Sequence, residues 1–337
     1  MATTLDRAVI IKKESTFGTY PTVDRALEYL DGDTSINAKP NIYQGQGLRA
    51  GALLPDGSRR VITKYNTEGS LGVECLAKGQ GTLCEILMGS GASTLVSTGV
   101  YQQVFTMAAQ IPSFSIQEQW FLVGTDLVDT FTAATYTTYG AMVTDWELSM
   151  TEDVAVLKVN FAGRKTDTVQ SPVAVTLPST STQPLSRANL SFSTGTLTAA
   201  TTTALASATT AVTGFDSITV KVNNNLNLDR PGSSGLRGKP VPAGPREIEV
   251  TISGLEHRDA TFETAYSAQT AVSFLTDYTG LALTTGNEHL QVAIADLRVD
   301  DLTKKVENGV PKLDLVLKGQ QATTPMQVVI RTADNAL

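Results

Sequence analysis

The strongest structural signal in the chain is a long β-hairpin pattern in its first half. Residues Ala141–Gly163 read AMVTDWELSMTEDVAVLKVNFAG, and after a turn near Thr151–Asp153 the second arm separates apolar and polar residues onto two faces. Such alternation is typical of strands that are buried on one side only. Shorter alternating runs recur, among them Val100–Met107, Pro112–Leu122 and Arg246–Glu256. The sequence therefore predicts a mainly β fold, a β-sandwich or barrel with short flanking helices.

Two short helices and two long connections interrupt the predicted strands. Residues 77–89 place their leucine and isoleucine side chains on one helical face, and Gly89 stands where it can cap the helix. Residues 258–269 form the second predicted helix. Residues 40–67 and 230–245 show little periodicity, and long irregular connections in compact domains are usually functional or disordered. We expect these two loops to contact other subunits.

The two halves of the chain repeat one order of elements: strand, long loop, strand, short helix, strand, strand. Both long loops contain a GLR string, at residues 47–49 and 235–237. Residues 166–213 between the halves are rich in Thr, Ser and Ala and poor in large apolar side chains, which favours a connector over a core segment. We predict a first half at residues 1–165, a connector at 166–213 and a second half at 214–337, with both halves integrated in one domain.

Composition excludes several classes of protein. The chain has 26 Lys+Arg against 33 Asp+Glu, a net charge of −7, which disfavours binding of nucleic-acid backbone through a basic face. The N-terminal residues MATTLDRAVIIKKE are too charged for a signal peptide, and no stretch reaches the ~20 apolar residues of a membrane span. We expect Cys75 and Cys84 to be small core residues, and His257 and His289 to be solvated or structural.

No motif predicts an enzyme. Residues 45–51 read GQGLRAG, which lacks the spacing of a dinucleotide loop. Residues 89–99 lack the GK[ST] ending of a phosphate loop, and we expect them to cap a helix or form a loop. Asp300 and Asp301 are adjacent, so on a strand they point to opposite faces and cannot act as one acid–base pair. The two Cys and two His residues have no metal-ligand spacing. We predict no catalytic residue, no cofactor and no metal site.

Basic residues gather in both long loops, with Arg49, Arg59 and Arg60 in the first and Arg237 in the second. Such clusters could bind phosphate or meet an acidic patch on a neighbouring subunit. In an acidic protein we favour the acidic patch.

Five sequence blocks carry a family resemblance. They are KKESTFGTYPTVDRALEYL, GQGLRAG followed by EGSLGVECLAKGQGTLCEILMGSG, VYQQVFTMAAQIPSFSIQEQ, GAMVTDWELSMTEDVAVLKVNFAGR and NNNLNLDRPGSSGLRGKPVPAGPREIEV. In this order the blocks resemble the major tail tube proteins of long-tailed, non-contractile bacteriophages. Phe17 stands where the family has Tyr, and Gln103 stands where a His is common. The resemblance covers most of the chain outside the Thr-rich connector.

The resemblance implies a structural virion protein of the phage tail that is made and assembled in the host bacterial cytoplasm. Such proteins form rings of six subunits whose strands join in a β-barrel around a lumen, and the rings stack into a tube. The implied partners are further copies of the chain, the tape-measure protein, tail terminator and tail-tip proteins, and viral DNA that passes without sequence-specific binding. No membrane insertion is implied.

Within this interpretation we expect eight residues to lie in contacts between rings or subunits: Gly47, Leu48, Arg49, Arg59, Arg60, Gly235, Leu236 and Arg237. Two alternatives stay open. One is a tube subunit of a related secretion or injection system, and the other is a β-rich adhesive or carbohydrate-binding tail decoration.

Overall fold

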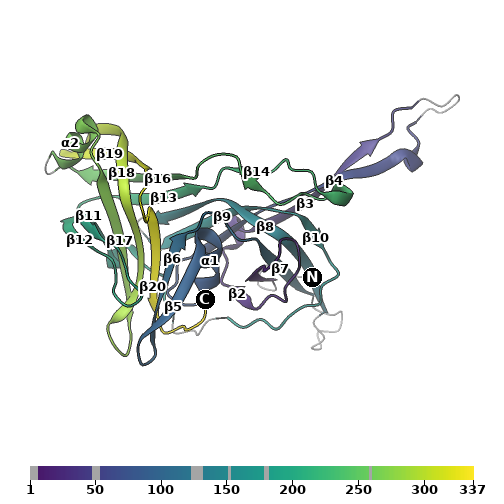
Figure 1. Cartoon of the computed structure of the whole chain (residues 1–337), viewed down its shortest axis with the longest axis horizontal. Coiled ribbons are helices and arrows are strands. Elements are labelled where there is room, and N and C mark those ends of the chain that lie inside the picture. The colour runs from purple at the N-terminus through teal and green to yellow at the C-terminus, as the bar shows by residue number, and fades with distance from the viewer. Residues whose placement is uncertain (1–6, 48–53, 123–131, 151–152, 178–181, 258–259) are drawn as a thin grey trace.

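The computed structural model describes residues 7–47, 54–122, 132–150, 153–177, 182–257 and 260–337. Within these ranges the chain consists mainly of antiparallel strands with two short α-helices (Figure 1). The prediction of a mainly β fold is confirmed, and the strands form a sandwich rather than a closed barrel.

The elements follow the chain in two series. The first series is β1 (Arg7–Lys13), β2 (Arg25–Leu27), η2 (Asp31–Asp33), β3 (Ser35–Gln44), η3 (Gly57–Arg59), β4 (Arg60–Glu74), α1 (Gly81–Met88), β5 (Gly89–Ser97), β6 (Val100–Met107), β7 (Phe114–Leu122), β8 (Thr132–Met150), β9 (Ala155–Gly163) and β10 (Lys165–Asp167). The second series is η4 (Arg187–Asn189), β11 (Leu190–Thr198), β12 (Ser207–Val212), β13 (Ser217–Asn223), β14 (Leu226–Asn227), η5 (Ser233–Gly235), β15 (Val241–Pro242), β16 (Glu247–Glu256), α2 (Thr261–Ala268), β17 (Val272–Ala282), β18 (Asn287–Glu307), β19 (Val310–Gly319) and β20 (Met326–Thr332).

One sheet, which we call the eight-strand sheet, runs through both halves of the chain. Its pairing order is β3-β4-β9-β8-β13-β16-β19-β18, and every neighbouring pair is antiparallel. In Figure 1 it extends from the β18–β19 hairpin beside α2 to β3 and β4 at the opposite end of the molecule. Its strands alternate between buried and accessible residues, for example in β9 and β13, because one face covers the core and the other is polar.

Two smaller sheets share the long strands β8 and β18 with the eight-strand sheet. The first has the order β2-β1-β7-β8-β10. The second has the order β12-β11-β17-β18-β20-β6-β5. β8 has 19 residues and β18 has 21, so each is long enough to bend from one sheet into the next. These shared strands tie the layers of the sandwich together.

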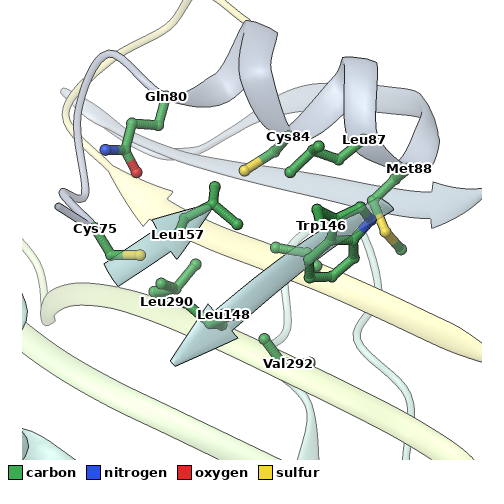
Figure 2. A pocket seen from close by; sticks show the side chains of 11 residues that line it. Cys75, Gln80, Cys84, Leu87, Met88, Trp146, Leu148, Leu157, Leu290 and Val292 are labelled. Carbon is green, nitrogen blue, oxygen red and sulfur yellow. The ribbon is translucent and has the colours of Figure 1, made fainter. Parts of the chain in front are cut away.

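Helix α1 fills the space between the layers. Seven of its eight residues are buried, and it ends at Gly89, whose left-handed φ of 97° matches the predicted C-cap. A cavity of about 30 Å³ remains beside it, lined mostly by apolar side chains from α1, β8 and β18 (Figure 2). Cys75 and Cys84 line this cavity as buried free thiols, which agrees with the expectation of small core residues.

Three expectations about loops are wrong. Residues 40–44 and 60–67 are not an irregular loop but belong to strands β3 and β4, which form a long antiparallel hairpin. Residues 89–97, expected to be a loop or cap, form strand β5 after the cap at Gly89. The connector 166–213 contributes to the core, because its β11–β12 hairpin joins β17 and buries Phe192. Small and polar side chains hide the strand pattern in the second and third segments, whereas the first has apolar residues that are exposed and so do not alternate with polar ones.

Candidate assembly surfaces

The outer face of the eight-strand sheet is a polar surface with interleaved charges. A row of five charged residues crosses five adjacent strands, and each residue stands directly opposite the next: Lys158, Glu147, Lys221, Glu249 and Lys318. The amine of Lys318 also forms an ion pair with Glu249, which raises the pKa of that lysine through the hydrogen bond. Because positive and negative side chains alternate, this row offers no continuous basic track that would hold phosphate groups.

Both ends of the eight-strand sheet are open edges among the residues that the structure describes. Strand β3 pairs only with β4, and β18 from Arg298 onward pairs with β19 on one side. Ile36 on β3 and Leu302 on β18 are apolar side chains that pack at the margins of the core but stay partly exposed. An open strand edge with unpaired backbone groups readily accepts a further strand.

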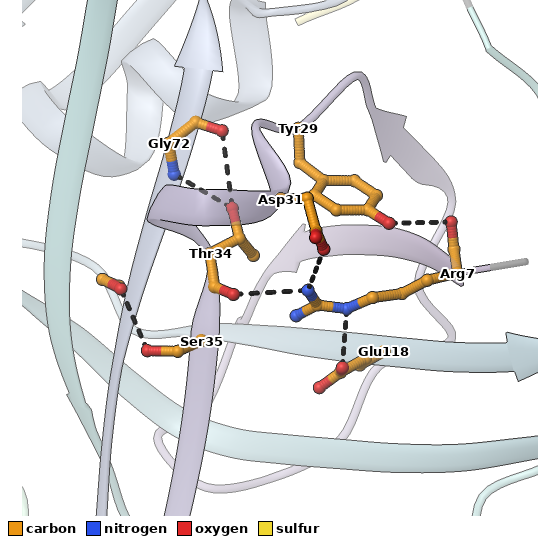
Figure 3. Close-up of polar contacts among 8 residues, drawn as sticks. Arg7, Tyr29, Asp31, Thr34, Ser35, Gly72 and Glu118 are labelled. Carbon is orange, nitrogen blue, oxygen red and sulfur yellow. Dashed lines mark hydrogen bonds and ion pairs between the residues drawn. The ribbon is translucent and has the colours of Figure 1, made fainter. Parts of the chain in front are cut away.

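A buried ion pair anchors the β3 edge to the body of the subunit (Figure 3). The Arg7 Nε lies 2.6 Å from Glu118 Oε1, and the two side chains are only 5% and 8% exposed. The Arg7 Nη1 also donates to the carbonyl of Thr34, directly before β3, and approaches Asp31 Oδ1 at 3.3 Å. Burial raises the pKa of the Glu118 carboxyl, and the Arg7 charge partly opposes that rise. Arg7 thus fixes where β3 starts.

The two halves of the eight-strand sheet have the same internal order. In the first half β3 pairs with β4, β4 with β9 and β9 with β8. In the second half β13 pairs with β16, β16 with β19 and β19 with β18. Each half inserts an eight-residue helix after its second strand, and each helix ends in a left-handed residue, Gly89 or Gln269. We call these sets of four strands the first and second units.

The outer part of the β3–β4 hairpin projects from the body as an arm, at the end of the molecule opposite α2 (Figure 1). We define the arm as residues 42–63. Ile42 is opposite Ile62 and Tyr43 is opposite Val61, and all four side chains are about half exposed or more. Successive residues of a strand point to opposite faces, so each face of the arm carries one apolar pair. A hairpin with exposed apolar side chains on both faces is suited to insertion between surfaces of other subunits.

The second long connection packs against the base of the arm. Gly235 lies close to the backbone of Thr63, and Lys64 Nζ is 3.4 Å from Asp229 Oδ1. Arg237 is buried at 4% exposure, and its Nη1 donates to the carbonyls of Thr67 and Gly163. Its Nη2 is 3.6 Å from Glu68 Oε1. This arginine therefore holds the connection to β4 and β9 within one subunit.

The eight residues expected at contacts do not form one cluster. Gly47 and Arg59 meet at the end of the arm, where Arg59 Nη1 donates to the Gly47 carbonyl at 2.8 Å, and Arg60 is exposed beside them. Gly235, Leu236 and Arg237 lie at the base of the arm. Leu48 and Arg49 fall outside the described residues. The apolar residues of the arm were missed, because residues 45–59 separate the paired strand ends Gln44 and Arg60, which is too long a connection to give a hairpin signal.

Outside these surfaces, the two histidines pair with carboxylates and the cavity beside α1 is small. No group of three or more His, Cys, Asp or Glu side chains that could hold a metal ion occurs in the described ranges. His257 faces Glu263 at 3.1 Å, and His289 Nδ1 is 2.9 Å from Asp277 Oδ1. The cavity in Figure 2 is too small and too apolar for a substrate. Within the same ranges, neither helix has the length and apolar character needed to cross a bilayer.

One comparison with known proteins identifies a family. The model of the phage tail tube protein family matches residues 4–322, nearly the whole chain. The match includes both units of the eight-strand sheet, the arm and the connector. No curated protein matches the chain.

Proposed function

Because this chain belongs to the phage tail tube protein family, a structural family of the virion tail, we propose that it assembles into stacked rings that form the tail tube. The observation that carries this proposal is the family match across both units of a sheet that is open at its two ends. The polar face of that sheet lines the lumen, which encloses the tape-measure protein during assembly and conducts DNA during ejection. Interleaved charges suit a conduit, because a basic lining would retain the DNA by releasing its counterions.

We propose the arm as the ring-to-ring contact. Its exposed apolar pairs, Ile42 with Ile62 and Tyr43 with Val61, lose contact with water when the arm enters the adjacent ring. Arg59 and Arg60 are placed to meet acidic groups there. From the sequence alone we also propose Arg49 as a partner of acidic groups and Leu48 as an apolar contact. We leave Arg237 out of this contact, since its guanidinium is occupied inside the subunit.

The adhesive alternative receives no support from the described surface. Glycan-binding modules usually present several aromatic rings on one face. The exposed tyrosines Tyr43, Tyr136 and Tyr266 lie on three separate elements, β3, β8 and α2. The remaining partners that we propose, the tail terminator and tail-tip proteins, would cap the two ends of the tube.

An arm-shortened variant tests the proposal. Asn41 and Lys64 are cross-strand partners, so residues 42–63 can be replaced by an Asn-Gly turn that keeps the strand pairs below, while Gly235 loses its contact with Thr63. We expect the purified wild-type protein to form hollow tubes in negative-stain electron microscopy. The variant should keep the β-type circular dichroism spectrum but give rings or small oligomers without tubes. Tubes of normal length from the variant would contradict the assignment of the arm.

A further inference from the structure

The open edges at the two ends of the eight-strand sheet have no partner in the described part of one chain. We propose that β3 of one copy pairs with the second half of β18 of the next copy, in the register that joins β8 to β13 within a single copy. The inference rests on the proposed tube function and names the lateral contact of that tube. It treats the junction between the two units of one chain as the template for the junction between chains.

Matching irregularities show which residues of the two units correspond. Both long strands carry a β-bulge, at Thr144 in β8 and at Asp300 in β18. Aligned on these bulges, VTDWELSM at residues 143–150 corresponds to VDDLTKKV at 299–306. The same alignment brings Gly163 of β9 onto Gly319 of β19. On the next strands, EGSLGVE at 68–74 corresponds to EVTISGLE at 249–256, where the second unit has one extra bulged residue.

The junction inside one copy consists of six antiparallel residue pairs between β8 and β13. They run from Met150 opposite Ile218 to Asp145 opposite Asn223. On the core side, apolar residues of both strands are buried, among them Trp146 and Val222, which face each other. On the polar side, Glu147 stands opposite Lys221. The junction thus combines backbone hydrogen bonds, a buried apolar row and a pair of opposite charges.

Transfer of this register to the open edges gives a specific contact between copies. Val220 of β13 faces Val250 of β16, and Ile36 of β3 faces Gly69 of β4. Val250 and Gly69 are equivalent in the alignment of the two units, so Val220 and Ile36 are equivalent as well. The six new pairs then run from Val306 opposite Thr34 to Asp301 opposite Lys39 of the neighbouring copy. Thr303 faces Asn37 at the centre of the polar side.

The side chains at the two edges fit this contact. Asp301 and Lys39 are both exposed and carry opposite charges, and the register places them face to face. Ile36 and Leu302 both lie on the core side and are partly exposed, so the junction would cover the margins of both cores. An edge buried in this way also escapes unspecific strand pairing.

Helix α2 leaves the β18 edge accessible. Its Glu263 contacts the amine of Lys304 at 2.6 Å. Leu148, the residue of β8 that corresponds to Lys304, lines the cavity beside Cys84 of α1. The two helices therefore lie over the same face of equivalent strands, and α1 does not prevent β13 from pairing with β8. By the same geometry, α2 does not block β3 of a neighbour.

The duplicated unit changes the number of chains in a ring. A barrel built from this sheet gains eight strands per chain, so two, three or six chains give 16, 24 or 48 strands. Typical strand spacing and tilt correspond to backbone diameters of about 30, 50 and 100 Å respectively. After the lining side chains are subtracted, the smallest barrel leaves no clearance around a DNA duplex and the largest is several-fold too wide. We therefore infer a ring of three chains with six equivalent units, in place of the six chains that the family resemblance implied.

Disulfide trapping tests the register and the count together. In the double variant Thr303→Cys with Asn37→Cys, the two cysteines face each other between copies but lie seven strands apart within one copy, about 34 Å. The native Cys75 and Cys84 are buried, so we expect them to form no disulfide during the oxidation. The matched control is Thr303→Cys with Asn41→Cys, which shifts one cysteine along β3 by four residues, about 13 Å. Each variant is first checked for tubes by electron microscopy and then oxidised and run on a non-reducing denaturing gel.

We expect covalent dimers and trimers from the double variant, with no larger species, and monomers from the control. Tubes without cross-links would overturn the junction while leaving the tube function intact. A ladder that continues to six would keep the junction and overturn the three-chain ring. If wild-type and variant proteins all remain monomers at every concentration, the proposed function fails and this inference fails with it.

A charge exchange provides a second test that needs no disulfide. Asp301→Lys or Lys39→Asp alone should raise the protein concentration needed for ring formation by at least about three-fold, because like charges then face each other. The combined exchange should restore assembly to near the wild-type concentration. Failure of the combined variant to improve on both single variants, when all three have the wild-type circular dichroism spectrum, would contradict the register.

Discussion

At the scale of single residues, Arg7 has a large expected effect on stability. It joins β1 to β7 through Glu118 and holds the chain before β3 through the Thr34 carbonyl. Removing one partner of a buried ion pair leaves the other charge without compensation, which costs about 3–5 kcal/mol. We expect Arg7→Ala to lower the free energy of unfolding in urea by this amount. Arg60→Ala, at an exposed site, is the matched control and should change it by less than about 0.5 kcal/mol.

The two thiols make a second prediction at this scale. Burial raises the pKa of Cys84 to about 12 and raises that of Cys75 further, so neither forms a thiolate near neutral pH. The folded protein should therefore not react with a thiol reagent such as Ellman's reagent at pH 8. After unfolding in guanidinium chloride, two thiols per chain should react. Rapid reaction of the folded protein would show that the core around α1 opens far more readily than its packing indicates.

At the scale of elements, the end of α1 depends on the conformation of Gly89. This residue has a φ of 97°, and an added Cβ would lie 2.8 Å from the Cβ of Ala108 and 3.0 Å from the Gln110 carbonyl oxygen. We expect Gly89→Ala to destabilise the fold by about 1–3 kcal/mol, measured by thermal or urea unfolding. Gly57→Ala is the control, since an added Cβ there meets nothing within 4 Å. Equal stability of both variants would show that the turn after α1 tolerates a side chain.

The accuracy of the sequence-based predictions also depended on the element. Strands β6 and β9 and the turn between β8 and β9 were predicted close to their observed bounds, because their side chains alternate between core and polar face. The prediction missed the first nine residues of β8, which begins at Thr132 and not at Ala141. The arm was mistaken for a loop because it has no core beneath it, so its strands lack one buried face. The role of Arg237 was equally hidden, since its partners are backbone carbonyls of β4 and β9 that come from two distant segments.

At the scale of the whole molecule, the sequence already indicated two similar halves, and the structure adds how they meet. The GLR strings are poor markers of the repeat, because Gly47 of the first lies on the arm and Gly235 of the second packs at the base of the arm. The bulges at Thr144 and Asp300 and the shared strand order are better markers of the repeat. They can be recognised only from the strand pairing in the structure and not from the sequence. One chain thus carries a complete example of the contact that we propose between chains.

The central claim is that this chain is the self-assembling subunit of a tail tube. Negative-stain electron microscopy of the purified full-length protein over a range of concentrations tests it most directly. We predict rings at low concentration and hollow stacked tubes at high concentration. A monodisperse monomer at every concentration, with an intact β-type circular dichroism spectrum, would contradict the claim.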